Sequence, residues 1–215
     1  PDNRGLGYYS GDDQPEVREG GKLIEALESP PLMSFFDRYF GEKSVTYDFK
    51  WVRATCRGGN TPAHYDIVYM GRGTQQVVTC WTPFGDIPLA QGPLCLLLGS
   101  HRCENVKETY GAIDVDTDPF PGALGSDAHE LASVFGGTWG TTEFQCGDIL
   151  LFTMFTLHGS LDNLTDTYRI TTDTRFQAAS QPVDERWMGE IPIAHSQQTP
   201  DERCSIAEAR EIWGF

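Results

Sequence analysis

The amino-acid sequence predicts a mainly β fold, in which antiparallel strands form a sandwich or a jelly roll. Short segments with strand character recur along the chain and are separated by turns that contain Gly, Pro and Asp. Few helical patterns interrupt them, which argues against a parallel α/β sheet. The 23 glycines and 13 prolines also suit strands and turns better than a helical bundle. The candidate strands are residues 45–51, 63–70, 76–82, 93–98, 149–156 and 168–177.

The N-terminal region is expected to supply a lead-in and one helix. Residues 1–15 are polar and rich in Gly, which indicates a loose lead-in. A helix is predicted from Pro30 to just before Gly41, because Pro favours a helix start and Gly a helix end. Between them, apolar side chains recur at helical spacing and form one stripe. These side chains are Leu32, Phe35, Phe36, Tyr39 and Phe40. We interpret this helix as a packing element.

After residue 44 the hydrophobic period changes from that of a helix to that of a strand. Val45, Tyr47, Phe49 and Trp51 alternate with more polar residues, as in a strand with one buried face. The later candidate strands follow in the same manner, so the chain of 215 residues is predicted to form a single domain.

Residues 103–146 break the rhythm of strands, with Asp, Gly and Pro scattered through the segment. So long a connection within a compact domain is uncommon and is usually functional. We therefore expect this insert to form a lid over a site, and surface decoration is the alternative. Near the C-terminus, Thr199–Glu202 matches a capping box with Pro at the first helical position. The helix that it opens is expected to end at Trp213, before Gly214.

Charge and composition restrict the partners of the chain. Its formal net charge of −15 disfavours binding to nucleic acid or to an anionic membrane surface. No apolar stretch approaches the ~20 residues that span a bilayer. We expect an intracellular, reducing location, because no signal peptide is visible and the six cysteines form no C-x-x-C pair. The chain does not begin with Met, so a preceding targeting segment stays open. Nothing in the sequence predicts an oligomeric state.

Three residues have the chemistry of a metal site. On a strand, His64 and Asp66 would project to the same side, about 7 Å apart, while Tyr65 points the other way. His158 follows an apolar strand and precedes Gly159. Two imidazoles and one carboxylate on one face of a metal leave the opposite face open, which suits Fe(II) that handles O₂. A hydrogen-bonded core histidine is the alternative for His158.

A carboxylate-binding group follows this set. Arg169 opens the last predicted strand, and a buried guanidinium is rare without a partner that it can bind in a two-pronged manner. Ser160, two residues after His158, could add a hydroxyl to the same carboxylate. The alternative is an internal ion pair between Arg169 and either Asp162 or Asp166.

These residues belong to a longer ordered pattern that resembles the phytanoyl-CoA dioxygenase family of 2-oxoglutarate-dependent oxygenases. The matching segments are His64–Asp66, Gly92–Pro93–Leu94 running to Leu98–Arg102, Gly147–Phe152, His158–Ser160, Asn163 and Arg169, and they lie within residues 64–177. The resemblance implies a double-stranded β-helix, a cupin-like jelly roll, with the metal inside one end.

The resemblance also implies roles for individual residues. His64, Asp66 and His158 would bind Fe(II), and Arg169 with Ser160 would hold the distal carboxylate of 2-oxoglutarate. Trp81 matches a tryptophan that lines the cosubstrate pocket; a plain core aromatic is its alternative.

One further cosubstrate contact follows from the family pattern less directly. A basic residue near the N-terminus often contacts the cosubstrate, and Arg53 is the candidate here. Tyr65 departs from the Gln that many members carry between the first two ligands, which puts in doubt any substrate contact carried over at this position.

The expected reaction is hydroxylation of a C–H bond in a small organic substrate, with consumption of O₂ and release of succinate and CO₂. The carboxylate of Asp66 favours this outcome, because related halogenases replace it with a small residue. A non-catalytic, metal-binding jelly-roll protein is the alternative function. A cupin dioxygenase without a cosubstrate would leave Arg169 unexplained. The candidate substrate contacts are Tyr69, Arg72, Asp173 and Arg175.

Overall fold

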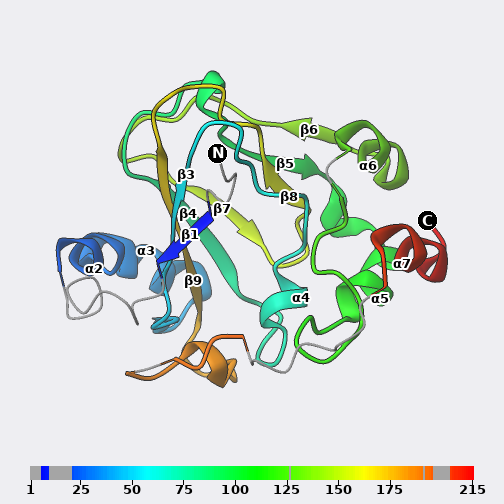
Figure 1. Cartoon of the computed structure of the whole chain (residues 1–215). Helices are drawn as coiled ribbons and strands as arrows, with labels where there is room; N and C mark the ends of the chain where they lie inside the picture. Colours follow the sequence, from blue (N-terminus) through cyan, green and yellow to red (C-terminus); the bar gives the residue numbers. More distant parts are fainter. Residues whose placement is uncertain (1–5, 10–20, 126, 191, 196–203) are drawn as a thin grey trace.

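The computed structural model describes residues 6–9, 21–125, 127–190, 192–195 and 204–215, which fold into two antiparallel sheets and a few helices (Figure 1). The strands are β1 (Leu6–Tyr9), β2 (Ser44–Thr46), β3 (Trp51–Thr55), β4 (Val78–Pro83), β5 (Leu94–Leu98), β6 (Thr138–Gly140), β7 (Leu150–Thr153), β8 (His158–Ser160) and β9 (Arg169–Ala178). The larger sheet has the order β1-β3-β9-β4-β7, with β2 also paired to β9, and the smaller one has the order β6-β5-β8. The predicted jelly roll is confirmed.

The helices flank these sheets. They are α2 (Lys22–Leu27), α3 (Pro30–Phe40), α4 (Ile67–Met70), α5 (Glu104–Glu108), α6 (Ala128–Phe135) and α7 (Ile206–Trp213). Short 3₁₀ turns are η2 (Leu89–Gln91), η3 (Ser100–Arg102), η4 (Tyr110–Ala112) and η5 (Glu185–Trp187). In Figure 1, α2 and α3 lie beside the larger sheet, whereas α5, α6 and α7 gather on the opposite side of the molecule.

Strand β9 is the central element, and its two faces have different chemistry. Side chains alternate along a strand, so Arg169, Asp173 and Arg175 share one face and Phe176 lies on the other. Phe176 stacks on Phe36 of α3, with ring centroids 3.8 Å apart. The face with the charged residues is turned to the interior, and all three are buried. A polar interior surface of this kind needs partners from other elements.

Helix α3 has the bounds that the sequence predicts. Pro30 occupies its first turn, and Gly41 ends it with a left-handed φ of 73°, which a residue without Cβ adopts at little cost. Its Phe36 is fully buried against the outer face of the larger sheet. The helix therefore packs on the sheet as expected.

Two of the predicted strands are wrong in part. Residues 45–51 are divided between β2 and β3, because the chain leaves the ladder where the Phe49 backbone N–H bonds the Trp187 carbonyl oxygen. Residues 63–70 do not form one strand either. Ala63 and His64 pair only in isolated bridges, with Gly125 and His158 respectively, and α4 begins at Ile67. A short buried apolar run has the same pattern in a strand and in a helical turn.

The insert of residues 103–146 is an ordered part of the fold. It contains α5, η4, α6 and β6, and β6 pairs with β5 of the smaller sheet. Several of its side chains are buried in the main core, among them Val106, Tyr110, Leu131 and Phe135. Its closure over the site stays a prediction, but it is more than surface decoration.

The ends of the chain differ from expectation. Helix α7 begins at Ile206, and its capping box is formed by Ser205 and Glu208. The predicted box, Thr199–Glu202, lies outside the described residues. The predicted end at Trp213, before Gly214, is confirmed. Within the lead-in, Leu6–Tyr9 form β1 and pair with β3 rather than remaining loose, and residues 1–5 and 10–15 lie outside the described part.

Two further predictions concern the thiols and the membrane. All six cysteines are free. Within the described ranges, no helix has the length and apolar character needed to cross a membrane.

Candidate metal centre and its cavity

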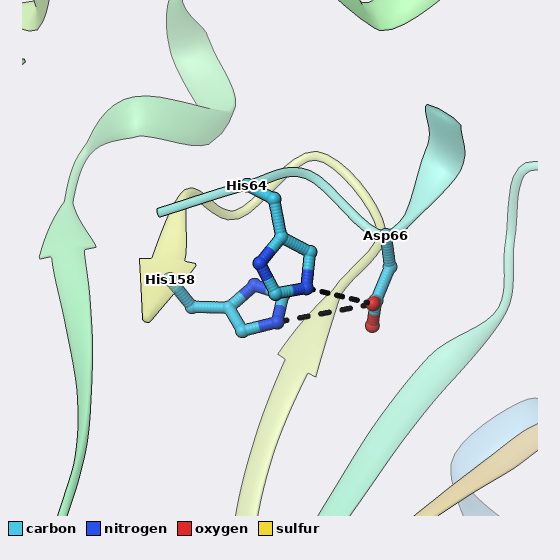
Figure 2. Close-up of side chains that lie close together, drawn as sticks. All are labelled: His64, Asp66 and His158. Carbon is cyan, nitrogen blue, oxygen red and sulfur yellow. Dashed lines mark ion pairs between the residues drawn. The ribbon is translucent and has the colours of Figure 1, made fainter. Parts of the chain in front are cut away.

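The two histidines of the predicted triad are held side by side by the backbone. His64 and His158 form an antiparallel bridge in which each backbone N–H donates to the other residue's carbonyl oxygen, at 2.9 and 3.1 Å. Their rings point in the same direction, with centroids 4.2 Å apart (Figure 2). Residues distant in sequence thus present two imidazoles at one place.

Asp66 reaches the same place by a route that the sequence did not predict. It has α-helical backbone angles, φ −65° and ψ −30°, and stands immediately before α4. Its Oδ1 lies 3.7 Å from His64 Nε2 and 3.8 Å from His158 Nε2. The ligand atoms of all three residues lie within 4.8 Å of one another. The expected grouping therefore forms, although not on one continuous strand.

Hydrogen bonds fix which nitrogen of each imidazole faces Asp66. His64 Nδ1 lies 2.8 Å from the Pro62 carbonyl oxygen, and His158 Nδ1 lies 2.9 Å from that of Thr156. A carbonyl oxygen only accepts, so each Nδ1 donates its hydrogen and leaves the Nε2 lone pair for another partner. Burial and the neighbouring His64 ring lower the pKa of His158 to about 3. A neutral imidazole of this kind is a metal ligand.

The carboxylate of Asp66 is oriented by two neighbours. Thr79 Oγ1 donates to its Oδ2 at 2.6 Å, and Arg175 Nη2 donates to its Oδ1 at 2.8 Å. Burial raises the pKa of Asp66, but the charge of Arg175 and the two imidazoles outweigh burial and leave it well below its usual range. Asp66 is therefore ionised and held in one orientation.

This donor set fits a divalent transition metal. Bonds from imidazole nitrogen and carboxylate oxygen to such a metal are about 2.0–2.2 Å long, so two ligands of one ion lie roughly 3–4 Å apart. The distances from Asp66 Oδ1 to both imidazoles fall in that range. Two histidines and one carboxylate are also the ligand type of non-haem Fe(II) oxygenases.

Arg169 lies deep in the structure beside Ser160. It is only 3% exposed, and its Nη2 donates to Ser160 Oγ at 3.0 Å and to Thr55 Oγ1 at 3.3 Å. Its Nε has no hydrogen-bond partner among the described residues. Burial and the nearby Arg53 lower the pKa of Arg169 to about 10, so the guanidinium remains charged at neutral pH.

The internal ion pairs that the sequence left open for Arg169 do not form. Asp162 accepts a hydrogen bond from Asn60 at 2.6 Å, and Asp166 pairs with Arg57 at 2.7 Å. In the described part of the chain, Arg169 contacts hydroxyl and carbonyl oxygens but forms no ion pair with a carboxylate. A buried positive group with these partners is suited to an anionic ligand.

A cavity of about 430 Å³ opens at the metal centre. Aromatic side chains form much of its wall, and the sequence-predicted residues Arg53, Tyr69 and Arg175 lie on it. The complete wall comprises Phe49, Trp51, Arg53, Thr61, Pro62, His64, Asp66, Tyr69, Met70, Ala123, Arg175, Trp187, Ala194 and His195. A space of this size and character is typical of a small-molecule site.

The sequence matches the phytanoyl-CoA dioxygenase (PhyH) family over residues 18–171, which is more than half of the chain. The chain belongs to the phytanoyl-CoA dioxygenase family. The resemblance expected from the motifs is thereby confirmed, and with it the class of enzyme, a 2-oxoglutarate-dependent oxygenase. No curated protein matches the chain in sequence.

Several solved structures share the fold. The epimerase SnoN from nogalamycin biosynthesis, in complex with Fe³⁺, alpha ketoglutarate and nogalamycin RO, has a TM-score of 0.61 at 15% identity, covering 94% of this chain and 75% of SnoN. EctD from S. alaskensis, with 2-oxoglutarate and 5-hydroxyectoine, has a TM-score of 0.60 at 16% identity, and the match covers 89% of this chain and 64% of EctD. The carbocyclase SnoK from nogalamycin biosynthesis has a TM-score of 0.59 at 14% identity, and the match covers 93% of this chain and 73% of SnoK. The chain thus spans about two thirds to three quarters of these relatives.

Within this family member, the remaining predicted residues have different surroundings. Asp173 pairs with Arg53 at 2.8 Å and lies 3.6 Å from Arg175. Trp81 is opposite Asp173 in the ladder, but its ring packs against Phe144 at 4.8 Å in a separate core cluster, and it is not among the residues that line the cavity. Its plain packing role is therefore visible, and its contact with a cosubstrate stays a prediction.

Arg72 lies in a charged network rather than on the cavity wall. Its Nε bonds Asp114 Oδ2 at 2.6 Å, and its side chain is 40% exposed. Arg72 therefore already has an ion-pair partner within the chain. A contact with the primary substrate stays untested.

Sequence reasoning missed three contributors to the site. Thr79 supports the carboxylate of Asp66, and the only signal was its position on the same face of β4 as Trp81. Trp187 and His195 line the cavity from a C-terminal segment that carries no recognisable motif. Their roles depend on a chain path that the local pattern does not encode.

Proposed function

We propose that this enzyme hydroxylates a C–H bond of a small organic substrate. One atom of O₂ enters the product as a hydroxyl, the other enters succinate, and 2-oxoglutarate loses CO₂. The observation that carries the proposal is a two-histidine, one-carboxylate centre together with a buried Arg169 that pairs with no carboxylate of the described residues. This is the combination that binds Fe(II) and a dicarboxylate cosubstrate together.

The residues have separate tasks in this reaction. His64, Asp66 and His158 would hold Fe(II), which with 2-oxoglutarate and O₂ supplies the oxidising chemistry. Arg169 and Ser160 bind the distal carboxylate of 2-oxoglutarate and set its orientation.

Other residues shape the surroundings of the reaction. Arg175 and Thr79 hold Asp66 so that one of its oxygens faces both imidazoles. The aromatic wall of the cavity excludes water and positions the substrate.

The first test is removal of a histidine ligand. His64→Ala and His158→Ala should lose most bound iron and all Fe(II)-dependent release of succinate, while circular dichroism shows an unchanged fold. His101→Ala is the matched control, because His101 is exposed and outside the triad. Full iron occupancy in purified His158→Ala would refute the ligand assignment.

The same assay separates the proposal from the alternative of a non-catalytic metal-binding jelly roll. An oxygenase turns over 2-oxoglutarate with Fe(II) and releases succinate, and it stops when Zn(II) replaces iron. A binding protein would hold either metal and release no succinate. An absence of Fe(II)-dependent turnover in the parent, with iron demonstrably bound, would therefore sink the proposal.

A further inference from the structure

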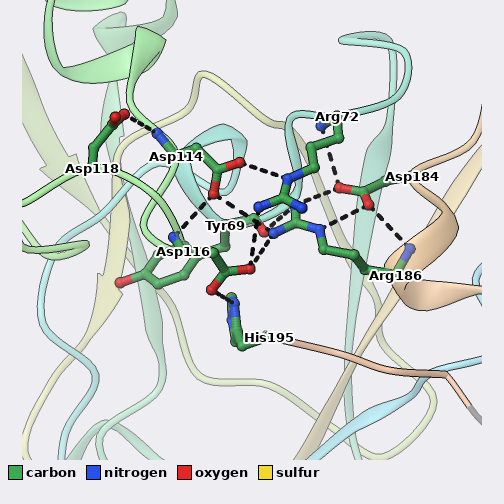
Figure 3. A network of polar contacts seen from close by, with 8 residues as sticks. All are labelled: Tyr69, Arg72, Asp114, Asp116, Asp118, Asp184, Arg186 and His195. Carbon is green, nitrogen blue, oxygen red and sulfur yellow. Dashed lines mark hydrogen bonds and ion pairs between the residues drawn. The ribbon is translucent and has the colours of Figure 1, made fainter. Parts of the chain in front are cut away.

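An ionic network, partly buried, includes Tyr69 and His195 of the cavity wall (Figure 3). Arg186 is its centre: its Nη2 pairs with Asp184 at 2.6 Å and donates to the Tyr69 carbonyl oxygen at 3.0 Å, while its Nη1 pairs with Asp116. Asp116 comes from the 103–146 insert and is 2% exposed. The network thus ties the insert to the C-terminal segment and to the loop after α4.

His195 is attached to this network and reaches the cavity. Its Nδ1 lies 3.0 Å from Asp116 Oδ1. A carboxylate only accepts, so Nδ1 carries the hydrogen, and in the neutral form of the ring Nε2 is then an acceptor. In the parts of the chain that the structure describes, no hydrogen bond involves His195 Nε2, and the side chain is 41% exposed on the cavity wall.

Aromatic contacts fix the plane of this imidazole. Its ring meets Trp187 edge-on, with centroids 5.0 Å apart, and Tyr69 at 5.8 Å. Tyr69 in turn meets the ring of the metal ligand His64 at 5.4 Å. One aromatic ring therefore separates His195 from the metal centre, and the acceptor is oriented before any ligand arrives.

We propose that His195, positioned by Asp116, accepts a hydrogen bond from a hydroxyl group of the primary substrate. This inference rests on the proposed oxygenase function and specifies its substrate class. The substrate is a compact cyclic or aromatic alcohol or phenol without net charge. Its hydroxyl binds His195, and its ring lies between the aromatic walls near the metal.

The walls support a ring-shaped, uncharged substrate. Trp51 and Trp187 lie 4.7 Å apart at their centroids, and Phe49 meets both, so flat apolar surface covers this side of the cavity. The two arginines on the wall already have internal carboxylates: Arg53 pairs with Asp173, and Arg175 with Asp66. The described wall of the cavity therefore presents no excess positive charge that would select an anionic substrate.

The test measures selectivity between a hydroxyl and its methyl ether. The probes are phenol with anisole and cyclohexanol with methoxycyclohexane, bound to the anaerobic Fe(II)–2-oxoglutarate complex and followed by the shift of its chromophore. The parent should prefer each hydroxyl compound about tenfold, equivalent to about 1.4 kcal/mol. In His195→Phe the preference should fall to about twofold or less, and His195→Gln, which retains an acceptor, should keep part of it.

His129→Phe is the matched control, because His129 is exposed on α6 and does not line this cavity. It should keep the full preference. The inference is overturned if no probe shifts the parent chromophore, if the parent does not distinguish hydroxyl from ether, or if His195→Phe retains the parent's preference.

The chromophore itself keeps this inference separable from the proposed function. His195→Phe should still form it with unchanged affinity for 2-oxoglutarate, since His195 is not a cosubstrate contact. A parent that binds iron but forms no 2-oxoglutarate-dependent chromophore would refute the oxygenase proposal, and the substrate inference with it. A parent that forms the chromophore but does not prefer hydroxyl compounds would refute only the inference about His195.

Discussion

The surroundings of two buried arginines, Arg169 and Arg186, differ in one respect that separates structure from function. Both side chains are 3% exposed. Arg186 is surrounded by carboxylates, with Asp184 and Asp116 in contact and Asp114 at 3.7 Å. Among the described residues, Arg169 hydrogen-bonds only neutral oxygens, and Asp173 acts on it through charge without forming an ion pair with it. Carboxylates of the protein therefore balance the charge of Arg186, whereas Arg169 forms no such ion pair among the described residues.

The pKa values follow the same division. Burial lowers the pKa of both guanidinium groups. At Arg186, hydrogen bonds and charge from Asp184 and Asp116 outweigh burial and raise the pKa above its ordinary value. At Arg169, burial and the charge of Arg53 outweigh the opposing charge of Asp173, and the pKa falls to about 10. A buried arginine with its own carboxylates stabilises the fold, whereas one without them signals a site for an anion.

Truncation of Arg186 should have the largest effect. Arg186→Ala would leave Asp116 and Asp184 buried without their counter-charge, which costs about 3–5 kcal/mol of unfolding free energy. For a chain of this length, that corresponds to a fall in Tm of roughly 6–20 °C. Thermal unfolding of the metal-free protein measures it. Arg169→Ala is the comparison variant and should change Tm much less; an equal loss in both would abolish the distinction.

Truncation of Arg169 should instead weaken the cosubstrate complex. Arg169→Ala would leave the distal carboxylate of 2-oxoglutarate buried and unpaired, at about 2–5 kcal/mol. This is roughly a thirtyfold to several-thousandfold loss of affinity, measured by anaerobic titration of the Fe(II) chromophore. Iron binding should survive. Arg169→Lys should recover only part, because an ammonium cannot make the two-pronged contact. An Arg169→Ala variant that titrates like the parent would assign the arginine to another partner.

Removal of the hydroxyl that supports Asp66 should have a smaller effect on the metal. Thr79→Val preserves shape but deletes the 2.6 Å hydrogen bond to Oδ2. Loss of such an outer contact weakens metal affinity by about 10- to 100-fold. Competition with a chelator measures the Fe(II) affinity. Thr82→Val, on the opposite face of β4, should match the parent. Equal affinities in both variants would show that Arg175 alone orients the carboxylate.

The smallest effect concerns acid stability of the Arg186 network. Burial raises the pKa of Asp114, but hydrogen bonds from Arg72 and the Asp116 backbone outweigh it and leave the pKa below the usual 3.8. A lowered folded-state pKa adds stability above pH 3.8 that is lost as pH falls through the folded-state value. Because Asp114 is partly exposed, we expect less than about 1 kcal/mol. The Tm difference between the metal-free parent and Asp114→Asn should be present at pH 6 and shrink toward pH 3. A difference that grows on acidification would contradict this sign.

The sequence predicted the chemistry of the site better than its geometry. Two imidazoles and a carboxylate could be recognised by residue type, although Asp66 stands at a helix start rather than on the expected strand. Arg175 could be named as a cavity candidate, yet strand alternation could not show that its partner is Asp66. Parity is local, whereas an ion pair depends on how distant segments meet.

The ligand-facing side of the cavity was predictable to a lesser degree. His195 and Asp116 come from segments without strand or helix periodicity, and only the folded chain brings them together. The long insert indicated a functional segment, but not which of its carboxylates would support a cavity residue. Tertiary contacts between irregular segments leave no period in the sequence.

The backbone bridge between His64 and His158 has a consequence for the order of assembly. Two main-chain hydrogen bonds already close the long loop between the histidines, so the conformational entropy of bringing them together is lost on folding rather than on metal capture. Iron binding therefore gains little from further restriction of the chain, in contrast to domains whose apo form is unfolded. The metal site should therefore be preformed in the folded apoprotein, and metal should bind and dissociate without unfolding of the jelly roll.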